Sequence, residues 1–132
     1  MIQQLIFLIE DRDGEKFGYY LNTEIIDKYR CDIKTDDKSF HFNLQSNGRL
    51  QQPMKFEIKD LKYGGYKLWG KSDSYFLIRL GDIWLWKEDC KNESCCFQTE
   101  DRFNYHGIKK ALCGKVDPNY FTPKRILVIQ MK

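Results

Sequence analysis

Residues 11–20 read DRDGEKFGYY, and residues 39–44 read SFHFNL. The first segment follows an apolar run at residues 5–9 and predicts a β-hairpin, because its Asp side chains can bond to the local backbone and Gly14 can take the positive φ of a tight turn. The second strand of this hairpin begins at Phe17. We expect Gly18 to avoid a side-chain clash where two backbones approach closely.

The segment at residues 39–44 predicts a strand with strict alternation, since successive side chains of a strand point to opposite faces. Its apolar row is Phe40, Phe42 and Leu44. Its polar row is Ser39, His41 and Asn43. We expect the apolar row to be architectural and to meet a second sheet. We expect His41 to face solvent or to form a hydrogen bond.

The rest of the chain contains further short strand patterns. Strands are expected at residues 54–58, 66–69, 95–98 and 125–131, the last one buried, and a second hairpin at residues 75–87 turns at Gly81. Short helices are expected from Asn22 or Thr23 to residue 29 and near residues 108–112. About eight short strands at close spacing are typical of an antiparallel sandwich. The sequence therefore predicts one domain over residues 1–132, mainly β, built as a two-sheet antiparallel β-sandwich with one or two short flanking helices.

The composition agrees with this fold class. Of 132 residues, 42% are hydrophobic and 15% aromatic, and aromatic side chains pack well on pleated surfaces. The net charge of +3 permits contact with nucleic acid or an acidic surface without requiring it. With no secretory signal and no window of ~18 apolar residues, we expect an intracellular protein, cytoplasmic or nuclear, without membrane insertion. Its five cysteines should then be reduced thiols.

These segments resemble the TLDc domain family, the module of oxidation-resistance proteins and of some nuclear-receptor coactivators. The similarity lies in D-G-x-x-F-G at residues 13–18, in S-F-x-F-x-L at residues 39–44, and in a looser block, GDIWL at residues 81–85 followed by NESCCF at residues 92–97. It spans roughly residues 5–131. The residues that carry the two specific motifs are Asp13, Gly14, Phe17, Gly18, Ser39, Phe40, Phe42 and Leu44.

The resemblance implies a two-sheet β-sandwich and a non-enzymatic role in protection from oxidative stress. In some relatives that role looks like binding to the vacuolar proton-pumping ATPase. The chain departs from the family pattern, because its third block has less glycine, its last strand lacks the usual acidic residue, and the usual segment upstream of Leu5 is missing. It resembles a divergent or N-terminally short member, so the family's partner is not carried over to it.

Three cysteines, Cys90, Cys95 and Cys96, form a candidate redox group. Lysines beside Cys90 would lower its pKa, and a reversible disulfide with Cys95 or Cys96 could then form. Together with His106 and Cys113 they also suggest a zinc site. Adjacent cysteines on a strand point to opposite faces, however, so buried structural thiols are the simpler interpretation.

Basic residues interleave with aromatic residues along much of the chain. A β-surface with lysines and stacked aromatic rings can hold single-stranded nucleic acid, or a duplex through its phosphates. Acidic residues are dispersed among the basic ones, so ordinary solvated lysines are the alternative. The candidate nucleic-acid surface comprises Lys62, Lys67, Lys71, Lys109, Lys110, Lys124 and Arg125.

The sequence contains no nucleophile elbow, zinc-protease helix, phosphate-binding loop or dinucleotide fingerprint. No catalytic residue, metal ion or cofactor is predicted from it, and enzymatic activity is not indicated. The leading hypothesis is a non-catalytic TLDc-like module in an oxidative-stress response that binds a macromolecular partner, in the first place a protein. One alternative is a stress-responsive regulator of transcription that binds DNA or another nucleic acid through its basic, aromatic-rich surface. A second alternative is a thiol-based redox sensor.

Overall fold

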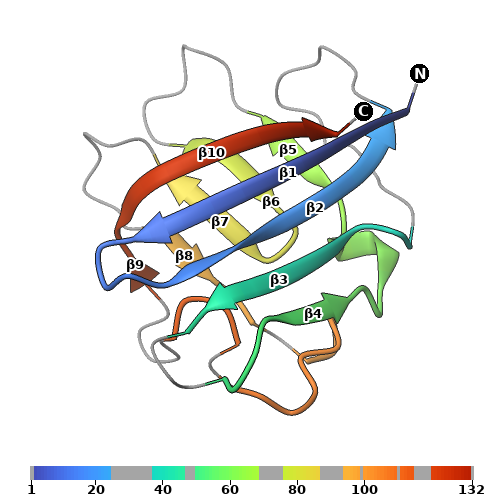
Figure 1. The fold of residues 1–132 in the computed structure, drawn as a ribbon. Helices are drawn as coiled ribbons and strands as arrows, with labels where there is room; N and C mark the ends of the chain where they lie inside the picture. The colour runs from blue at the N-terminus through green and yellow to red at the C-terminus, as the bar shows by residue number, and fades with distance from the viewer. Residues whose placement is uncertain are drawn as a thin grey trace.

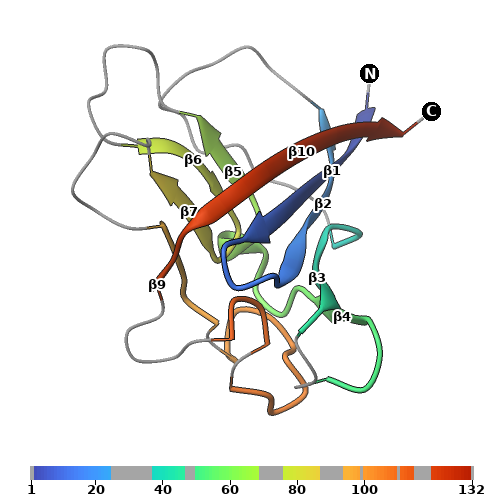
Figure 2. The ribbon, with the colours of Figure 1, turned by 60° about the vertical axis from the view of Figure 1, so that its left-hand side comes forward.

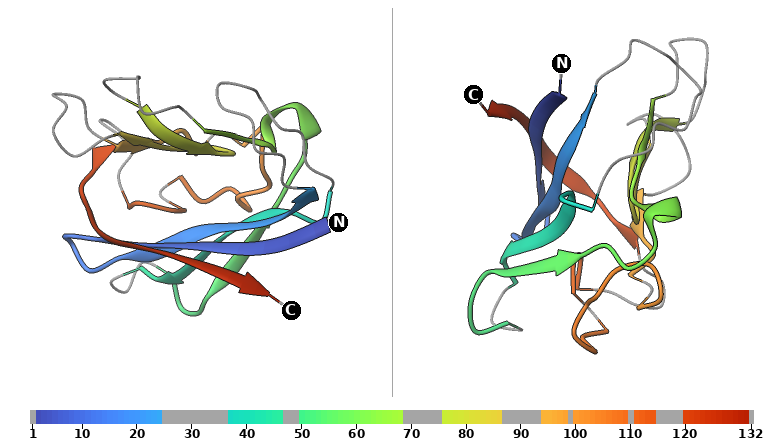
Figure 3. Two further views of the ribbon diagram at one scale, coloured as in Figure 1. Left: turned by 90° about the horizontal axis from the view of Figure 1, so that it is seen from above. Right: turned by 90° about the vertical axis from the view of Figure 1, so that its right-hand side faces the viewer.

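Two antiparallel sheets face each other in this computed structural model, as Figure 1 and Figure 3 show. The structure describes residues 2–24, 37–46, 50–68, 76–86, 94–98, 100–109, 111–114 and 120–131. Sheet A has the strand order β10-β1-β2-β3-β4, and sheet B has the order β5-β6-β7-β8-β9. The predicted fold class, a mainly β, two-sheet antiparallel sandwich, is confirmed.

The strands of sheet A are β1 (Ile2–Asp11), β2 (Lys16–Glu24), β3 (Phe40–Gln45), β4 (Met54–Glu57) and β10 (Pro123–Met131). The strands of sheet B are β5 (Tyr66–Leu68), β6 (Phe76–Leu80), β7 (Ile83–Trp86), β8 (Ser94–Cys96) and β9 (Tyr120–Phe121). Within the described ranges, the one helical element is a short 3-10 turn, η1 (Leu61–Tyr63). Figure 2 shows β10 running along sheet A from the β9 end of sheet B to the two chain termini.

The β1–β2 turn has the geometry that its sequence predicts. Asp11 is buried, and its Oδ1 atom accepts hydrogen bonds from the backbone N–H groups of Asp13 and Glu15, each at 3.0 Å. Gly14 has a φ of 85°, in the left-handed region that favours glycine. The Asp11 carboxylate therefore accepts hydrogen bonds from backbone N–H groups inside the turn, and Gly14 adopts there a conformation that is strained for other residues.

Gly18 in β2 lies where two backbones approach, as expected. A Cβ atom added there would collide with the carbonyl oxygen of Phe7 and would lie 2.9 Å from the ring of Phe42. Because the Phe7 oxygen belongs to the backbone of β1, no side-chain movement would relieve the collision. The prediction for Gly18 is confirmed.

Strand β3 turns its polar row toward sheet B, so the expectation that its apolar row meets the second sheet is wrong. His41 and Asn43 are buried at 0% and 1% exposure, whereas Leu44 is 48% exposed. Phe40 and Phe42 lie on the same side as Leu44, against residues of β2 on the outside of sheet A. The strict alternation of β3 is as predicted, but its sense is reversed.

Hydrogen bonds explain why the polar row can be buried. The Oγ atom of Ser39 accepts a hydrogen bond from the N–H of Asn22 at 2.8 Å. The side-chain amide of Asn43 donates to the carbonyl oxygens of Ala111 and Leu112, both at 3.0 Å. Burying a polar group costs free energy mainly when it lacks such partners, and here the fold supplies them.

The two predicted short helices fare differently. Asn22 and Thr23 lie inside β2, so neither caps a helix, and residues 25–29 lie outside the described residues. The described residues near 108–112 form turns and bends rather than a helix. The predicted hairpin at Gly81 is confirmed, because Gly81 joins β6 to β7 with a φ of 54°.

The core lies between the sheets. Sheet A contributes the rings of Phe17, Tyr19 and Phe56 to the core, and sheet B contributes Leu80, Ile83, Leu85 and Phe121, all with exposed fractions of 1% or less. The loop that carries Phe103 and Tyr105 closes one side of the core. The last strand contributes little to this core, since of residues 125–131 only Ile126 packs against it. β10 is an edge strand with Val128 57% and Ile129 44% exposed, so the predicted burial of residues 125–131 is wrong.

Candidate functional site

A buried polar network joins the two sheets at the centre of the core. The Nε2 atom of His41 accepts a hydrogen bond from the N–H of Asp82 at 3.0 Å, and its Nδ1–H group donates to the carbonyl of Gly18 at 3.1 Å. The hydroxyl of Tyr105 donates to Oδ2 of Asp82 at 2.7 Å, while Nη1 of Arg102 lies 3.7 Å from Oδ1. The network therefore connects β3, the β6–β7 turn and the loop at residues 100–109.

Burial fixes the protonation states of this network. Desolvation lowers the pKa of His41 to about 3, against the smaller opposing effect of its bond to Gly18. Desolvation and the charge of Asp82 raise the pKa of Tyr105 well above its ordinary value. At neutral pH the imidazole is neutral and the phenol keeps its proton. Of the two alternatives expected for His41, the structure shows the hydrogen-bonded one and not the solvent-facing one, and the role of His41 in this geometry is to tie the sheets together.

The described cysteines lie in β8 of sheet B and in the neighbouring segment at residues 111–114. Cys95, Cys96 and Cys113 are all buried free thiols, and Cys113 forms a side-chain hydrogen bond with Cys96. Desolvation, with a smaller effect of Cys113, raises the pKa of Cys95 to about 11, and desolvation also raises the pKa of Cys96. A redox-sensing thiol needs the opposite shift. Cys90, the third member of the candidate redox group, lies outside the described residues.

The proposed zinc ligands do not converge among the residues for which coordinates are described. No group of three or more His, Cys, Asp or Glu side chains in that part of the chain is placed to hold a metal ion. His106 lies instead on the surface beside β4, where its Nε2 atom is 3.3 Å from the carbonyl oxygen of Lys55.

The outer side of sheet A carries a broad apolar surface, which we call the sheet A outer face. Figure 1 looks onto this side of the sheet. The pairing register aligns Ile129, Ile6, Tyr20 and Phe40 in one row across four strands, and Leu127, Leu8, Gly18 and Phe42 in the next row. The face also includes Leu44 and Met131, which are 48% and 45% exposed. Surfaces of this kind mark interaction sites in many proteins.

Charged pairs border the sheet A outer face at both edges of the sheet. On β4, Nζ of Lys55 lies 3.7 Å from Oε1 of Glu57 and 4.4 Å from the centre of the Phe40 ring. At the other edge, Glu10 lies 3.0 Å from Arg125 and 3.7 Å from Lys124. An apolar centre with a polar rim is the usual anatomy of a protein–protein interface.

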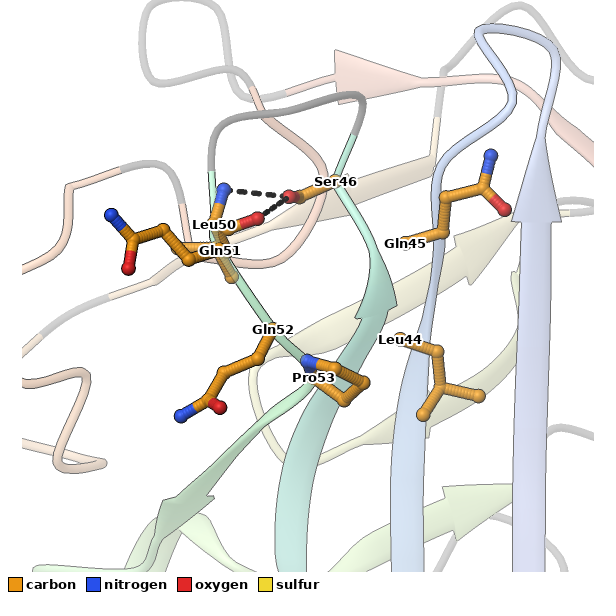
Figure 4. A pocket seen from close by; sticks show the side chains of 7 residues that line it. All are labelled: Leu44, Gln45, Ser46, Leu50, Gln51, Gln52 and Pro53. Atoms are coloured by element: carbon orange, nitrogen blue, oxygen red, sulfur yellow. Dashed lines mark hydrogen bonds between the residues drawn. The ribbon is translucent and has the colours of Figure 1, made fainter.

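An open pocket of about 330 Å³ adjoins this face between β3 and β4. Figure 4 shows the seven side chains that line it, among them the apolar Leu44, Leu50 and Pro53. The loop wall is held by Ser46, whose Oγ accepts from the N–H of Leu50 at 2.7 Å. Three glutamine amides, Gln45, Gln51 and Gln52, complete the lining. The pocket offers an apolar contact with amide donors and acceptors around it.

The outer side of sheet B carries a different surface, which we call the basic–aromatic row. The register aligns Lys67, Arg79, Trp84, Cys95 and Tyr120 across all five strands. The Arg79 guanidinium lies 6.0 Å from the centre of the Trp84 ring. Tyr120 is 44% exposed, whereas Cys95 is buried beneath its neighbours.

A second arginine extends the basic–aromatic row. The guanidinium of Arg102 lies 4.3 Å from the ring centre of Tyr63 and 5.4 Å from that of Phe97. Phe97 in turn meets the ring of Trp84 edge to face at 5.6 Å. Because the buried carboxylate of Asp82 also holds Arg102, this cation is fixed in position before any ligand arrives.

The structure divides the predicted basic residues among several places. Lys67 belongs to the basic–aromatic row, and Nζ of Lys62 lies 5.4 Å from the ring of Tyr63 beside it. Lys124 and Arg125 pair with Glu10 on sheet A. Lys109 is exposed in the loop at residues 100–109, and Lys71 and Lys110 lie outside the described residues. The predicted residues therefore do not form one continuous surface.

Sequence reasoning missed Arg79, Arg102 and Phe97 as parts of this surface. Arg79 sits at alternate spacing with Leu77 in β6 and directly before the Gly81 hairpin, so pairing across that hairpin could have placed it opposite Trp84. Arg102 follows no such pattern. It reaches Phe97 only because the loop at residues 100–109 folds over the end of sheet B.

Comparison of the chain with protein-family models, with curated proteins and with solved structures finds no match. Nothing in these comparisons supports or refutes the TLDc resemblance, which stays a prediction. Among the described residues there is no helix with the length and apolar character needed to cross a bilayer.

Proposed function

We propose that this protein is a binding module that holds a macromolecular partner, in the first place a protein, on the sheet A outer face. The observation that carries this proposal is the apolar face that the two rows form with Leu44 and Met131 across β10, β1, β2 and β3. Its most exposed side chains are Leu44, Leu127, Ile129 and Met131, at 39% to 48%, whereas Phe42 is only 9% exposed. Apolar surface gathered on one face and rimmed by charge is what a partner with complementary apolar side chains would cover.

The pocket beside Leu44 supports the same function. Binding energy in protein complexes is concentrated in a few side chains that fill pockets near the centre of an interface. Leu44, Leu50 and Pro53 provide the apolar contact for such an anchor, and the surrounding amides can bond to the partner's backbone. We expect the partner to place an aliphatic or aromatic side chain there.

The chemistry of the buried groups favours binding over catalysis. The His41 imidazole is enclosed and has a pKa of about 3, so it is a poor general base at neutral pH. The Cys95 and Cys96 thiols have raised pKa values and are poor nucleophiles. A role in an oxidative-stress response comes from the TLDc resemblance and sets the conditions for the experiment.

The test is an affinity capture from cells with and without peroxide, using the full chain and two matched variants. Leu44→Lys places a charge in the sheet A outer face, and Leu61→Lys places one in η1, where Leu61 is 50% exposed. We expect proteins that the wild type retains to be lost with Leu44→Lys and kept with Leu61→Lys. If both variants retain the same proteins, with unchanged circular dichroism, the sheet A outer face is not the docking site.

The basic–aromatic row supports a second candidate function, the binding of single-stranded nucleic acid. Aromatic rings that stack bases and fixed cations that meet phosphates are the two parts such a site needs. The basic–aromatic row and the residues that extend it offer Trp84, Phe97 and Tyr120 as rings, and Lys67, Arg79 and Arg102 as cations. This combination favours a flexible strand, whose bases can reach the rings, over a duplex.

Fluorescence anisotropy with labelled single strands over a salt series tests this function. Phe97→Ala should weaken binding by about tenfold, since stacking of one base contributes ~1–3 kcal/mol. Lys67→Ala should reduce the salt slope by about 1, as expected for one lost phosphate contact, and Lys55→Ala on sheet A should change neither quantity. Weak binding that does not vary with salt would remove nucleic acid from consideration.

A further inference from the structure

The four edges of the two sheets are protected to very different degrees. Within the described residues, the edge strands of sheet B are β5 with 3 residues and β9 with 2 residues, and such short edges offer little to pair with. The β4 edge of sheet A is covered by the loop at residues 100–109. There, the N–H of Asn104 donates to the carbonyl of Glu57 at 2.7 Å, and Ile58 forms a bridge with Phe103.

The edge formed by β10 has no such cover in the described part of the chain. It is 9 residues long, it pairs with β1 on one side, and no described strand lies on its other side. Every second residue of an edge strand directs its N–H and C=O groups away from the sheet, so β10 presents a row of these groups.

The side chains of β10 protect only its first part. Pro123, Lys124 and Arg125 are residue types that blunt an edge, and both cations pair with Glu10 of the same sheet. The following residues, 126–129, are Ile-Leu-Val-Ile. Leu127, Val128 and Ile129 are 39%, 57% and 44% exposed, although a strand that is apolar on both faces is typical of the interior of a sheet.

We propose that β10 pairs antiparallel with β10 of a second copy of this chain, about a two-fold axis perpendicular to sheet A. The two A sheets then form one continuous sheet. An antiparallel edge is complementary to its own copy by symmetry, since each donor of one strand meets an acceptor of the other. The strand therefore needs no further feature from its partner.

The charges of β10 favour this antiparallel arrangement. When Pro123–Met131 overlaps fully with its copy, the axis passes at Leu127, so that Leu127 lies opposite Leu127 of the second copy. By the same register, Ile126 lies opposite Val128, Arg125 opposite Ile129, and Lys124 opposite Gln130. The charged half of each strand meets the uncharged half of the other, and the central pairs are apolar. Parallel pairing would place like charges side by side.

This association goes beyond the proposed function and does not depend on it. An axis perpendicular to the sheet keeps the sheet A outer faces on the same side and leaves them uncovered. A dimer would therefore offer two adjoining copies of that face to one partner, which increases avidity without any new contact.

Sedimentation velocity over a wide range of protein concentration tests the proposal with purified protein alone. We expect the wild type to convert reversibly from monomer to dimer. Leu127→Lys and Leu127→Glu, each alone, should weaken dimerisation by at least ~tenfold, because like charges then lie directly opposite each other. An equimolar mixture of the two variants should dimerise again as a heterodimer.

Leu61→Lys is the control, because it adds the same charge at a side chain of similar exposure away from β10. It should dimerise like the wild type. Circular dichroism of each variant shows whether it is folded. A wild-type protein that stays monomeric at the highest concentration, or variants whose mixture stays monomeric, would overturn the proposal. Loss of the partner in the capture experiment would not, since that result concerns the sheet A outer face.

Discussion

His41 accepts a hydrogen bond from the backbone N–H of Asp82 at 3.0 Å, and this contact joins the middle of β3 in sheet A to the β6–β7 turn of sheet B. The same ring lies 4.5 Å from the ring of Tyr19 and 4.3 Å from that of Phe103, measured between centres. The imidazole thus packs as an aromatic core residue and also supplies one acceptor and one donor. No aliphatic side chain could do both.

The pH dependence of stability should report this burial. The pKa of His41 is about 3 in the folded protein and 6.5 as the reference value, so below pH 6.5 the unfolded chain takes up a proton that the folded protein does not. Stability is unaffected by this group above pH 6.5 and falls below it, by up to ~1.4 kcal/mol per pH unit. Urea unfolding of the wild type and of His41→Gln between pH 7 and 4.5 measures the effect.

At pH 7 the variant should be less stable by about 1–3 kcal/mol, because it loses the fit of the ring and its two hydrogen bonds. The difference between the two proteins should shrink as the pH falls, since glutamine does not titrate. A constant difference over this pH range would mean that His41 is not held in its neutral form.

Tyr105→Phe should destabilise the protein by about 1–3 kcal/mol, because it removes the hydroxyl that donates to the buried carboxylate of Asp82. Tyr120→Phe is the matched control, since Tyr120 is 44% exposed and water can replace its partner. Thermal and urea unfolding should show a loss for the first variant only. Equal effects of the two substitutions would contradict the described network.

Two glycines separate the effects of crowding and of backbone conformation. Gly18→Ala should cost about 3 kcal/mol or more, or prevent folding, because the new methyl group meets the Phe7 carbonyl. Gly107→Ala should cost only ~1–2 kcal/mol, since φ is 75° there and no atom lies within 4 Å of the added Cβ. If Gly107→Ala were the more damaging change, the pairing of β1 with β2 would be misassigned.

The buried thiols should react slowly in the native protein. A pKa raised from 9.0 to about 11 leaves Cys95 with roughly 100-fold less thiolate at neutral pH, and its burial restricts access further. Alkylation followed by mass mapping should modify Cys95, Cys96 and Cys113 only after denaturation. Fast modification of Cys95, or a disulfide from it to Cys90 under mild peroxide, would revive the hypothesis of a thiol sensor.

The sequence predicted the architecture well because the features that determine it involve residues close together in the chain. Turn chemistry at Gly14 and Gly81 and alternation in β3 determine where strands begin and pair, and these depend on near neighbours in the chain. Alternation alone cannot say which face of a strand is inside. The side chains of His41 and Asn43 point into the core because they form hydrogen bonds with Asp82 and with residues 111–112, which are distant in the sequence.

The same limit applies to the surfaces. The apolar residues of β10 predicted a buried strand. In the described part of the chain no strand pairs with its outer side, and the sequence alone does not reveal this. The basic–aromatic row likewise depends on pairing across β5 to β9, and on the placement of Arg102 by Asp82. Lys62 and Lys67 could be chosen from local spacing, whereas Arg79 and Arg102 required the fold.

Site-specific photo-crosslinking tests most directly whether the sheet A outer face binds the partner. A photo-reactive amino acid replaces Leu44 in one variant and Leu77 of sheet B in another, and these two side chains are 48% and 44% exposed. After irradiation of cells under peroxide, we expect a discrete protein adduct from position 44 and none from position 77. An adduct from position 77 alone, or none from either position, would contradict the assignment of partner binding to this face.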